Sequence, residues 1–311
     1  MRTVKFMFTL CVVLLLAMFS NGAWILLRLD DVKPGKEPVP ISYYQSESSP
    51  RAGLEQLESN TGEELPVNMI VLGLDEERTR SDVILLFNFE PGLSRLNILS
   101  IARDTMVMED GRYYKINALY SKGGEVLLAN KISEITGLPV HYFVTMDFKG
   151  FRKIIDTLGG VEFNVPFRMS YDDPTQNLHI HLKKGMQVLD GKKAEQLVRY
   201  RKGNYKGQGY IDGDIGRIKM QQDFIKALIG QKLSFGYISK ADELFDILQS
   251  YVKTNVTISD ITQYMGSIRK MKGDEIKAGT LPGDSRMIDG AWYFIYDKEE
   301  TAAIISGGFY R

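Results

Sequence analysis

The apolar residues of the chain form one long uncharged run near the N-terminus and many short runs after residue 65. Short runs at 68–74, 83–89 and 96–101 are typical of strands buried on both faces. Pro91-Gly92 separates the second run from the third, so these two strands are predicted to form a hairpin. The same pattern predicts strands at 141–146, 161–165, 276–281 and 292–296, and helices at 124–136, 147–158, 191–200, 215–233, 241–251 and 258–271, followed by a last helix.

Strands and helices alternate along this part of the chain, which is typical of an α/β domain. Because some neighbouring strands are joined as hairpins, the expected architecture is a central mixed sheet with helices on both faces. Asp147 suits the N-cap of one predicted helix, and Gly159 suits the position just after its end. We therefore expect one α/β domain over residues 66–311.

The long apolar run covers residues 6–27 and contains no charged side chain. As a helix these 22 residues would extend roughly 33 Å, which matches a hydrocarbon core of about 30 Å. A cleavable signal peptide is the rival interpretation, because Ser20-Asn21-Gly22 offers small residues near a cut. The apolar run continues past that point, so the sequence favours one retained transmembrane helix.

Charges next to this run predict its orientation. Arg2 and Lys5 precede it, so the positive-inside tendency places the tail of residues 1–5 in the cytoplasm and the chain from Arg28 onward outside the cell. Residues 28–65 contain several prolines and polar residues without a period, as expected of an extracellular linker. The predicted location is the cell membrane, crossed once, with the folded domain outside.

Composition and charge exclude several classes of protein. Lys and Arg together number 39, as do Asp and Glu, so the formal net charge is zero and a nucleic-acid partner is not expected. Cys11 is the only cysteine, which excludes an intrachain disulfide and a cysteine-based zinc cluster. With 44% hydrophobic and 25% charged residues, the chain is not disordered over most of its length.

The sequence offers little for nucleophilic catalysis. The single cysteine lies in the apolar run, and no Gly-x-Ser-x-Gly motif is present. His141 stands at the start of a predicted strand. His179 and His181 are two residues apart and would share one face of a strand, which makes half of a metal site, but no third ligand with a suitable spacing is evident nearby. The favoured interpretation of this pair is structural.

Carboxylates and arginines at the ends of predicted strands are more informative. Asp75 directly follows the first strand, and Asp82 directly precedes the second. Two carboxylates at strand ends can hold a hard divalent cation, although ordinary polar loop residues would look the same. Arg103-Asp104 follows the third strand and is either a further part of this site or a simple loop ion pair.

A second basic group lies later in the chain. Arg199 and Arg201 stand at the end of a predicted helix, and a glycine-rich stretch separates them from the next helix. On that helix Arg217 and Gln221 share a face, because they are four residues apart. Arginines together with two carboxylates, and without a nucleophile, suit the binding of a pyrophosphate with Mg²⁺.

Taken in order, these residues resemble the motifs of the LytR-CpsA-Psr family, whose members are thought to attach secondary glycopolymers to peptidoglycan in Gram-positive bacteria. Each motif alone is weak, but the set is collinear over residues 66–235 and agrees with the membrane anchor. The matching stretches are 68–75, 80–82, 100–105, 115–117, 147–151, 158–161, 178–189, 198–201 and 214–222.

The resemblance implies a role for each matching residue. Asp75 and Asp82 fall where the family holds Mg²⁺ or Mn²⁺. The positions that fall where the family binds the pyrophosphate of a polyprenyl-linked substrate, including one further polar residue of that site, are Arg103, Arg199, Arg201, Arg217, Gln221 and Asp214.

Two positions depart from the family pattern. Ala102 replaces a proline before Arg103, which is expected to loosen that turn slightly. Met220 stands where a basic residue usually precedes the glutamine. One basic contact of the family is therefore expected to be missing or supplied by another residue.

The activity implied by the resemblance is a phosphotransfer with Asp75, Asp82 and Arg103 as catalytic residues. A peptidoglycan hydroxyl would attack an undecaprenyl-pyrophosphate-linked glycopolymer, a phosphodiester would form, and undecaprenyl phosphate would leave. The same motifs fit hydrolysis of the pyrophosphate by water. A non-catalytic lipid-phosphate-binding regulator of the envelope is the alternative from another class, and the metal-type carboxylate pair argues against it.

Overall fold

The computed structural model describes residues 65–75, 77–173, 178–200, 203–205, 209–210, 250–271 and 275–307, together with isolated residues between 220 and 247. The predicted transmembrane helix at 6–27 and almost all of the predicted linker lie outside this part, as do most of the predicted helices at 215–233 and 241–251. Among the described residues, no helix is long and apolar enough to cross a membrane.

The described chain divides into two compact units. Unit 1 contains the residues up to Thr145 and those from Lys253 onward, and unit 2 contains Met146–Val252. The strand β6 (Tyr142–Asp147) runs across this boundary.

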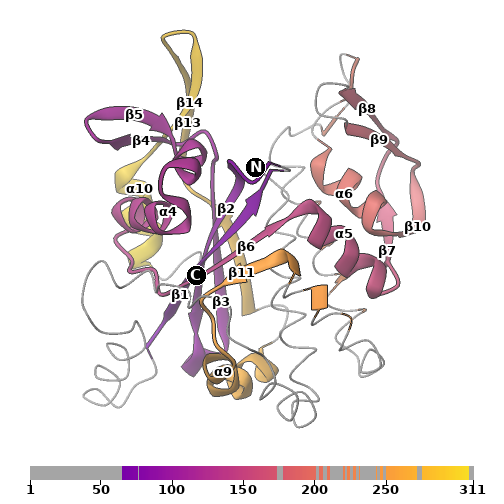
Figure 1. Ribbon diagram of the computed structural model, residues 1–311, viewed down its shortest axis with the longest axis horizontal. Coiled ribbons are helices and arrows are strands. Elements are labelled where there is room, and N and C mark those ends of the chain that lie inside the picture. The colour runs from indigo at the N-terminus through magenta and orange to yellow at the C-terminus, as the bar shows by residue number, and fades with distance from the viewer. Residues whose placement is uncertain are drawn as a thin grey trace. The chain divides into compact units, whose positions relative to one another are not determined.

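The central sheet has six strands in the order β11-β6-β1-β2-β3-β12 (Figure 1). Its middle strands β1, β2 and β3 are antiparallel neighbours, and β12 pairs with β3 in parallel, so the predicted mixed sheet is confirmed. The predicted turn at Pro91-Gly92 forms the 3-10 helix η3 (Pro91–Leu93) between β2 and β3. The strand bounds are β1 Val67–Leu74, β2 Ser81–Glu90, β3 Arg95–Ile101, β11 Val252–Thr254 and β12 Ile276–Thr280.

Apolar side chains on the two faces of β2 meet different helices. Ile84 and Leu86 are fully buried in a core cluster that includes Leu128 and Ile132 of α4 (Tyr120–Thr136). Phe89 points to the opposite face, because side chains alternate along a strand, and its ring packs edge-on against Tyr264 of α9 (Ile258–Lys270) at 6.0 Å. Helices therefore cover both faces of the sheet, as expected.

A glycine interrupts the helix α4 near its beginning. The helix α4 contains a kink at Gly124, whose φ of 58° and ψ of −149° lie in a region open almost only to glycine. The helix begins at Tyr120, four residues before the predicted start at Gly124, and its regular part follows the kink. The helix ends at Gly137, which has a left-handed φ of 71°.

Unit 2 contains two helices with side-chain caps. The helix α5 (Phe148–Thr157) begins at Asp147, whose carboxylate accepts from the Gly150 N–H at 2.9 Å, as predicted. The helix α6 (Gly191–Arg199) has the same kind of cap from Asp190. The two helices approach so closely that a Cβ on Gly191 would lie 2.3 Å from the Arg152 carbonyl oxygen.

The remaining elements of the two units include several short strands that the apolar pattern did not predict. Unit 1 carries the hairpin β4–β5, the 3-10 helix η4, the hairpin β13–β14 and the last helix α10, and unit 2 carries the pairs β7–β10 and β8–β9 (Figure 1). Of these, β14, β7 and α10 match predicted elements. The bounds are β4 Met106–Glu109, β5 Arg112–Lys115, η4 Ile116–Leu119, β7 Val161–Val165, β8 Met169–Asp173, β9 Leu178–Leu182, β10 Gly185–Leu189, β13 Gly283–Ile288, β14 Ala291–Tyr296 and α10 Lys298–Ser306.

The side chain of His141 joins two central strands through a hydrogen bond. It lies one residue before β6, is buried, and its Nδ1 accepts from the Asn68 N–H of β1 at 2.9 Å. Burial lowers the pKa of His141 to about 4. The imidazole is therefore neutral in the folded protein at neutral pH, which the hydrogen bond requires because a protonated ring has no acceptor.

This histidine predicts a loss of stability in mild acid. The unfolded state binds the proton near pH 6.5 and the folded state near pH 4, so the free energy of unfolding falls as the pH falls through this window. Between pH 7 and pH 5 His141 is expected to contribute a loss of about 2 kcal/mol, measured by urea unfolding. His141→Gln keeps an acceptor and does not titrate, so it should lack this component. An equal pH dependence in both proteins would contradict the assignment.

Candidate functional site

Strand pairing in unit 1 brings three predicted site residues to one end of the sheet. The pairs Leu74↔Ser81 and Ile84↔Ile101 align the end of β1, the beginning of β2 and the end of β3. At that end, Asp75 directly follows β1, Asp82 is the second residue of β2, and Arg103 lies two residues after β3. The structure thus gathers residues that are separated by up to 28 positions in the sequence.

Asp75 organises the loop between β1 and β2. Its Oδ1 accepts from the backbone N–H groups of Thr79 and Arg80 at 2.8 and 3.2 Å, and its Oδ2 accepts from the Thr79 hydroxyl at 3.1 Å and from Arg80 Nε at 3.3 Å. Burial alone would raise the pKa of Asp75, but these hydrogen bonds from Arg80 and Thr79 outweigh it and leave the pKa below its ordinary value. The carboxylate is therefore ionised at neutral pH.

Asp82 lies inside β2 rather than before it, as the second residue of the strand. Its Oδ1 accepts from Nη1 of Arg103 at 2.9 Å, and both side chains are about one third exposed. The simple alternative of an Arg103–Asp104 ion pair fits less well, because those two side chains are 3.8 Å apart. Asp82 is therefore the close partner of this arginine.

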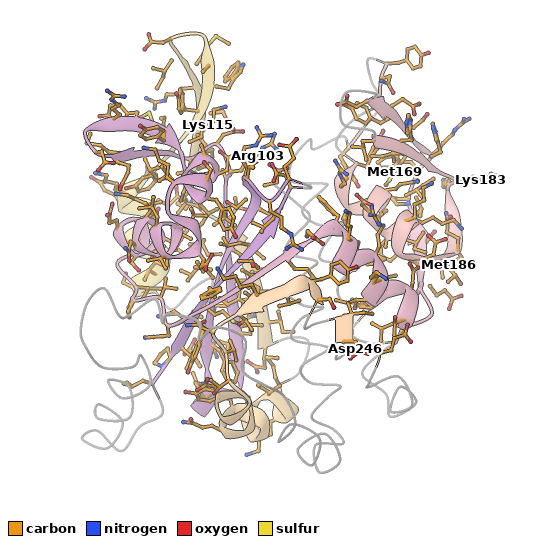
Figure 2. All side chains as sticks on the ribbon, in the orientation of Figure 1. Arg103, Lys115, Met169, Lys183, Met186 and Asp246 are labelled. Atoms are coloured by element: carbon orange, nitrogen blue, oxygen red, sulfur yellow. The ribbon has the colours of Figure 1, made fainter. Side chains whose placement is uncertain are left out.

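Lys115 is a further cation at this end of unit 1 and was not singled out as a site residue. It ends β5, and its Nζ lies 2.9 Å from Asp104 Oδ1 and 5.7 Å from the centre of the Tyr293 ring. Figure 2 labels Lys115 and Arg103 close together in this part of unit 1. The fold thus adds a second positive charge beside Arg103, although Lys115 belongs to one of the motif stretches.

The turn after β3 is held by two hydrogen bonds to one carbonyl. The Ala102 oxygen accepts from the Thr105 N–H at 2.9 Å and from the Thr105 hydroxyl at 2.6 Å. The Arg103 carbonyl in turn accepts from the Asn117 N–H at 3.2 Å. These bonds fix the backbone of Arg103 without the ring of a proline at position 102.

The donor set of this cluster suits a hard divalent cation. Carboxylate oxygens are the ligands that Mg²⁺ and Mn²⁺ prefer, and neither carboxylate is deeply buried, with exposed side-chain fractions of 14% for Asp75 and 31% for Asp82. Oδ2 of Asp82 has no hydrogen-bond donor among the described residues. Oδ2 of Asp75 accepts from the Thr79 hydroxyl at 3.1 Å and from Nε of Arg80, a side chain that is 60% exposed, at 3.3 Å. Asp75 and Asp82 are the residues that would hold such an ion.

Arg199 lies in unit 2, where it takes part in a network of buried charges. It is the last residue of α6, only 16% of its side chain is exposed, and its Nη1 donates to Glu195 at 2.8 Å. Glu195 also accepts from Arg152 of α5 at 2.6 Å. The Arg199 guanidinium lies 4.7 Å from the centre of the Phe148 ring. Sequence analysis did not identify Glu195, Arg152 or Phe148 as partners of this arginine.

The remaining predicted site residues are not among those that the structure describes. Arg201, Asp214, Arg217 and Gln221 all lie outside the described residues, so their assignment to a pyrophosphate site stays a prediction.

The mixed sheet is that of a known family of α/β domains. The model of the LytR_cpsA_psr family matches residues 42–307, which is most of the chain, so this chain belongs to that family. The resemblance found in the sequence motifs is confirmed.

Curated relatives match most of the chain. TagU of Oceanobacillus iheyensis, named a polyisoprenyl-teichoic acid–peptidoglycan teichoic acid transferase, is 32% identical over 254 residues, which cover 77% of this chain and 74% of the relative. TagU of Bacillus subtilis bears the same name and is 29% identical over 248 residues, which cover 77% and 76%. The crystal structure of Bacillus subtilis TagV superposes with a TM-score of 0.62 at 26% identity, covering 78% of this chain and 96% of TagV.

Proposed function

We propose that this chain is a membrane-anchored extracellular phosphotransferase. It transfers a glycopolymer from an undecaprenyl-pyrophosphate carrier to a hydroxyl group of peptidoglycan and leaves a phosphodiester. The observation that carries the proposal is the Asp82–Arg103 pair beside Asp75 at the end of the sheet, in a chain whose curated relatives are named teichoic acid–peptidoglycan transferases. The same arrangement can serve another wall glycopolymer, since the donor is recognised by its pyrophosphate.

Each residue of the cluster has a task that follows from its contacts. Arg103 has five N–H donors and uses one of them on Asp82, so it retains donors for phosphoryl oxygens. Asp82 keeps the guanidinium in place and has a second oxygen for a cation or for the proton of the attacking hydroxyl. Lys115 adds positive charge that favours the anionic substrate.

A divalent cation is the proposed cofactor of this cluster. Mg²⁺ or Mn²⁺ held by Asp75 and Asp82 would neutralise charge on the pyrophosphate oxygens as the bridging bond breaks. In unit 2, the proposed pyrophosphate-binding residues Arg199, Arg201, Arg217, Gln221 and Asp214 are assigned by the family resemblance.

Product analysis tests the proposal against its rivals. The full-length chain in detergent is incubated with a labelled undecaprenyl-pyrophosphoryl saccharide, with or without a peptidoglycan oligomer, in Mg²⁺ or in EDTA. The label is expected on the oligomer only when Mg²⁺ and the acceptor are both present. Equal release of saccharide phosphate without the acceptor would identify a hydrolase. Binding that is unchanged by EDTA, without any turnover, would identify a regulator.

The proposed location makes a separate prediction. If residues from Arg28 onward are outside the cell, a reporter that is active only in the cytoplasm should be silent when it is fused after Arg311. The control is the same reporter fused after Lys5, on the cytoplasmic side, which should be active. An active reporter at Arg311 would contradict the orientation and with it the lipid-linked substrate.

A further inference from the structure

The hairpin of β8 and β9 in unit 2 brings together three metal-ligating side chains that the proposed function does not use. Asp172 of β8 lies directly opposite His179 of β9 in the antiparallel register. His181 is two residues further along β9, so both histidines lie on the same face of the hairpin as Asp172. The third ligand that the sequence did not reveal is therefore Asp172, which the strand pairing supplies. In Figure 2 the labels Met169 and Lys183 mark the open end of this hairpin.

The ligating atoms already point at one another. His179 Nδ1 lies 2.6 Å from Asp172 Oδ1, and His181 Nε2 lies 3.2 Å from the same oxygen. All three ligand atoms lie within 4.8 Å of one another. Tetrahedral Zn²⁺ with bonds of about 2.0–2.2 Å needs its ligand atoms about 3.3–3.6 Å apart. Each imidazole nitrogen must therefore move away from the Asp172 oxygen by only about 1 Å or less.

Side-chain amides from outside the hairpin fix the backbone at two of the three ligands. The amide of Asn204 bonds to Asp172 in both directions, since it donates to the Asp172 carbonyl at 2.9 Å and accepts from the Asp172 N–H at 2.7 Å. Gln196 of α6 accepts from the His181 N–H at 3.0 Å. The Cα positions of the ligands are thus held, while their side chains are about half exposed and can rotate onto an ion.

We propose that Asp172, His179 and His181 form a site for Zn²⁺ that clamps β8 to β9. Two imidazole nitrogens and one carboxylate oxygen favour Zn²⁺ over Mg²⁺, which prefers oxygen ligands. Three protein ligands leave a fourth position for water. This site is distinct from the proposed cation at Asp75 and Asp82, because its three ligands all belong to unit 2.

Cobalt titration of the full-length chain in detergent tests the site, with a purification tag that contains no histidine. Co²⁺ is the spectroscopic probe, because tetrahedral coordination gives strong visible absorption. The expected result is one Co²⁺ per chain at this site, displaced by one equivalent of Zn²⁺ and not by millimolar Mg²⁺. Asp82→Asn should leave this signal unchanged, which separates the zinc site from the proposed phosphotransfer.

Ligand variants make the test decisive. His179→Gln, His181→Gln and Asp172→Asn should each weaken Zn²⁺ binding by about tenfold or more. Asp173→Asn, which alters the neighbouring carboxylate on the same strand, is the matched control and should stay within about twofold. Zn²⁺ should also raise the thermal midpoint of the unaltered chain but not that of the variant with both histidines replaced. Equal affinity in all variants would show that the two histidines only hydrogen-bond to Asp172 and would overturn the proposal.

Discussion

Replacing Asp82 by Asn is expected to reduce turnover of the lipid-linked saccharide by about 10²–10³-fold and to leave the fold intact. Asn retains an Oδ1 that accepts from Arg103, so the guanidinium keeps its hydrogen bond while the negative charge is removed. The side chain is 31% exposed, so its packing contributes little to stability. Turnover of the full-length chain in Mg²⁺ is the measurement, with thermal unfolding as the check on the fold.

The neighbouring carboxylate provides the matched control for this prediction. Asp104 pairs with Lys115 at 2.9 Å and is 40% exposed, so Asp104→Asn makes the same chemical change in a similar setting. It should alter turnover by less than about fivefold, because exposed ion pairs contribute about 0–1 kcal/mol. Equal losses in Asp82→Asn and Asp104→Asn would show that the general negative charge of this end matters, and not Asp82 itself.

The double variant separates two roles that the geometry permits. If Asp75 and Asp82 hold one ion, adding Asp75→Asn to Asp82→Asn should cost far less than its effect alone, as for residues that act as a unit. Losses that multiply fully would argue that one carboxylate holds the ion and the other accepts the proton. Thermal unfolding must accompany this comparison, since Asp75 also anchors the loop through Thr79 and Arg80.

The central strands were predictable because their residues are apolar on both faces. In β2, Val83, Ile84, Leu85 and Leu86 are each at most 1% exposed, which leaves no alternation and little choice of structure. The strands β4, β5 and β13 were not predicted by this criterion, because they are short and largely exposed. A different signal marks them: Asp110-Gly111 and Asp289-Gly290 each have two consecutive positive φ angles, the geometry of a tight hairpin turn.

The residues of the candidate site also differ in how well the sequence predicts them. Asp75 and Arg103 were recognisable because they lie one and two residues after a buried strand, and this closeness in the sequence was enough to place them. The contact of Lys115 with Asp104 and that of Glu195 with Arg152 join different elements, so no local pattern predicts them. The contact of Glu195 with Arg199 is different, because its four-residue spacing on one helix is a local signal. Asp172 and His179 are seven residues apart in the sequence, and only the register of the β8–β9 hairpin shows that they lie opposite each other.

Arg199→Lys is expected to reduce kcat/KM by about 10²–10³-fold if this arginine binds the pyrophosphate. Lysine keeps the positive charge and, at four residues from Glu195, can keep the ion pair. It loses the planar fork that meets two phosphoryl oxygens and the stacking on the Phe148 ring. The measurement is turnover of the full-length chain, taken together with its free energy of unfolding in urea.

If Arg199 had a purely structural role, its replacement would change the free energy of unfolding and not the turnover. Glu195→Gln shows how large the loss of stability is when this ion-pair network is broken. That variant removes the carboxylate between Arg152 and Arg199, two cations that cannot lose their protons, and should lower the free energy of unfolding by about 3 kcal/mol. Glu162→Gln, an exposed change on β7, is the control and should stay within about 0.5 kcal/mol. If Arg199→Lys loses turnover while its stability stays close to that of Glu162→Gln, Arg199 acts on the substrate. Near-normal turnover in Arg199→Lys would mean that this side chain only holds the end of α6, and the site assignment would be wrong there.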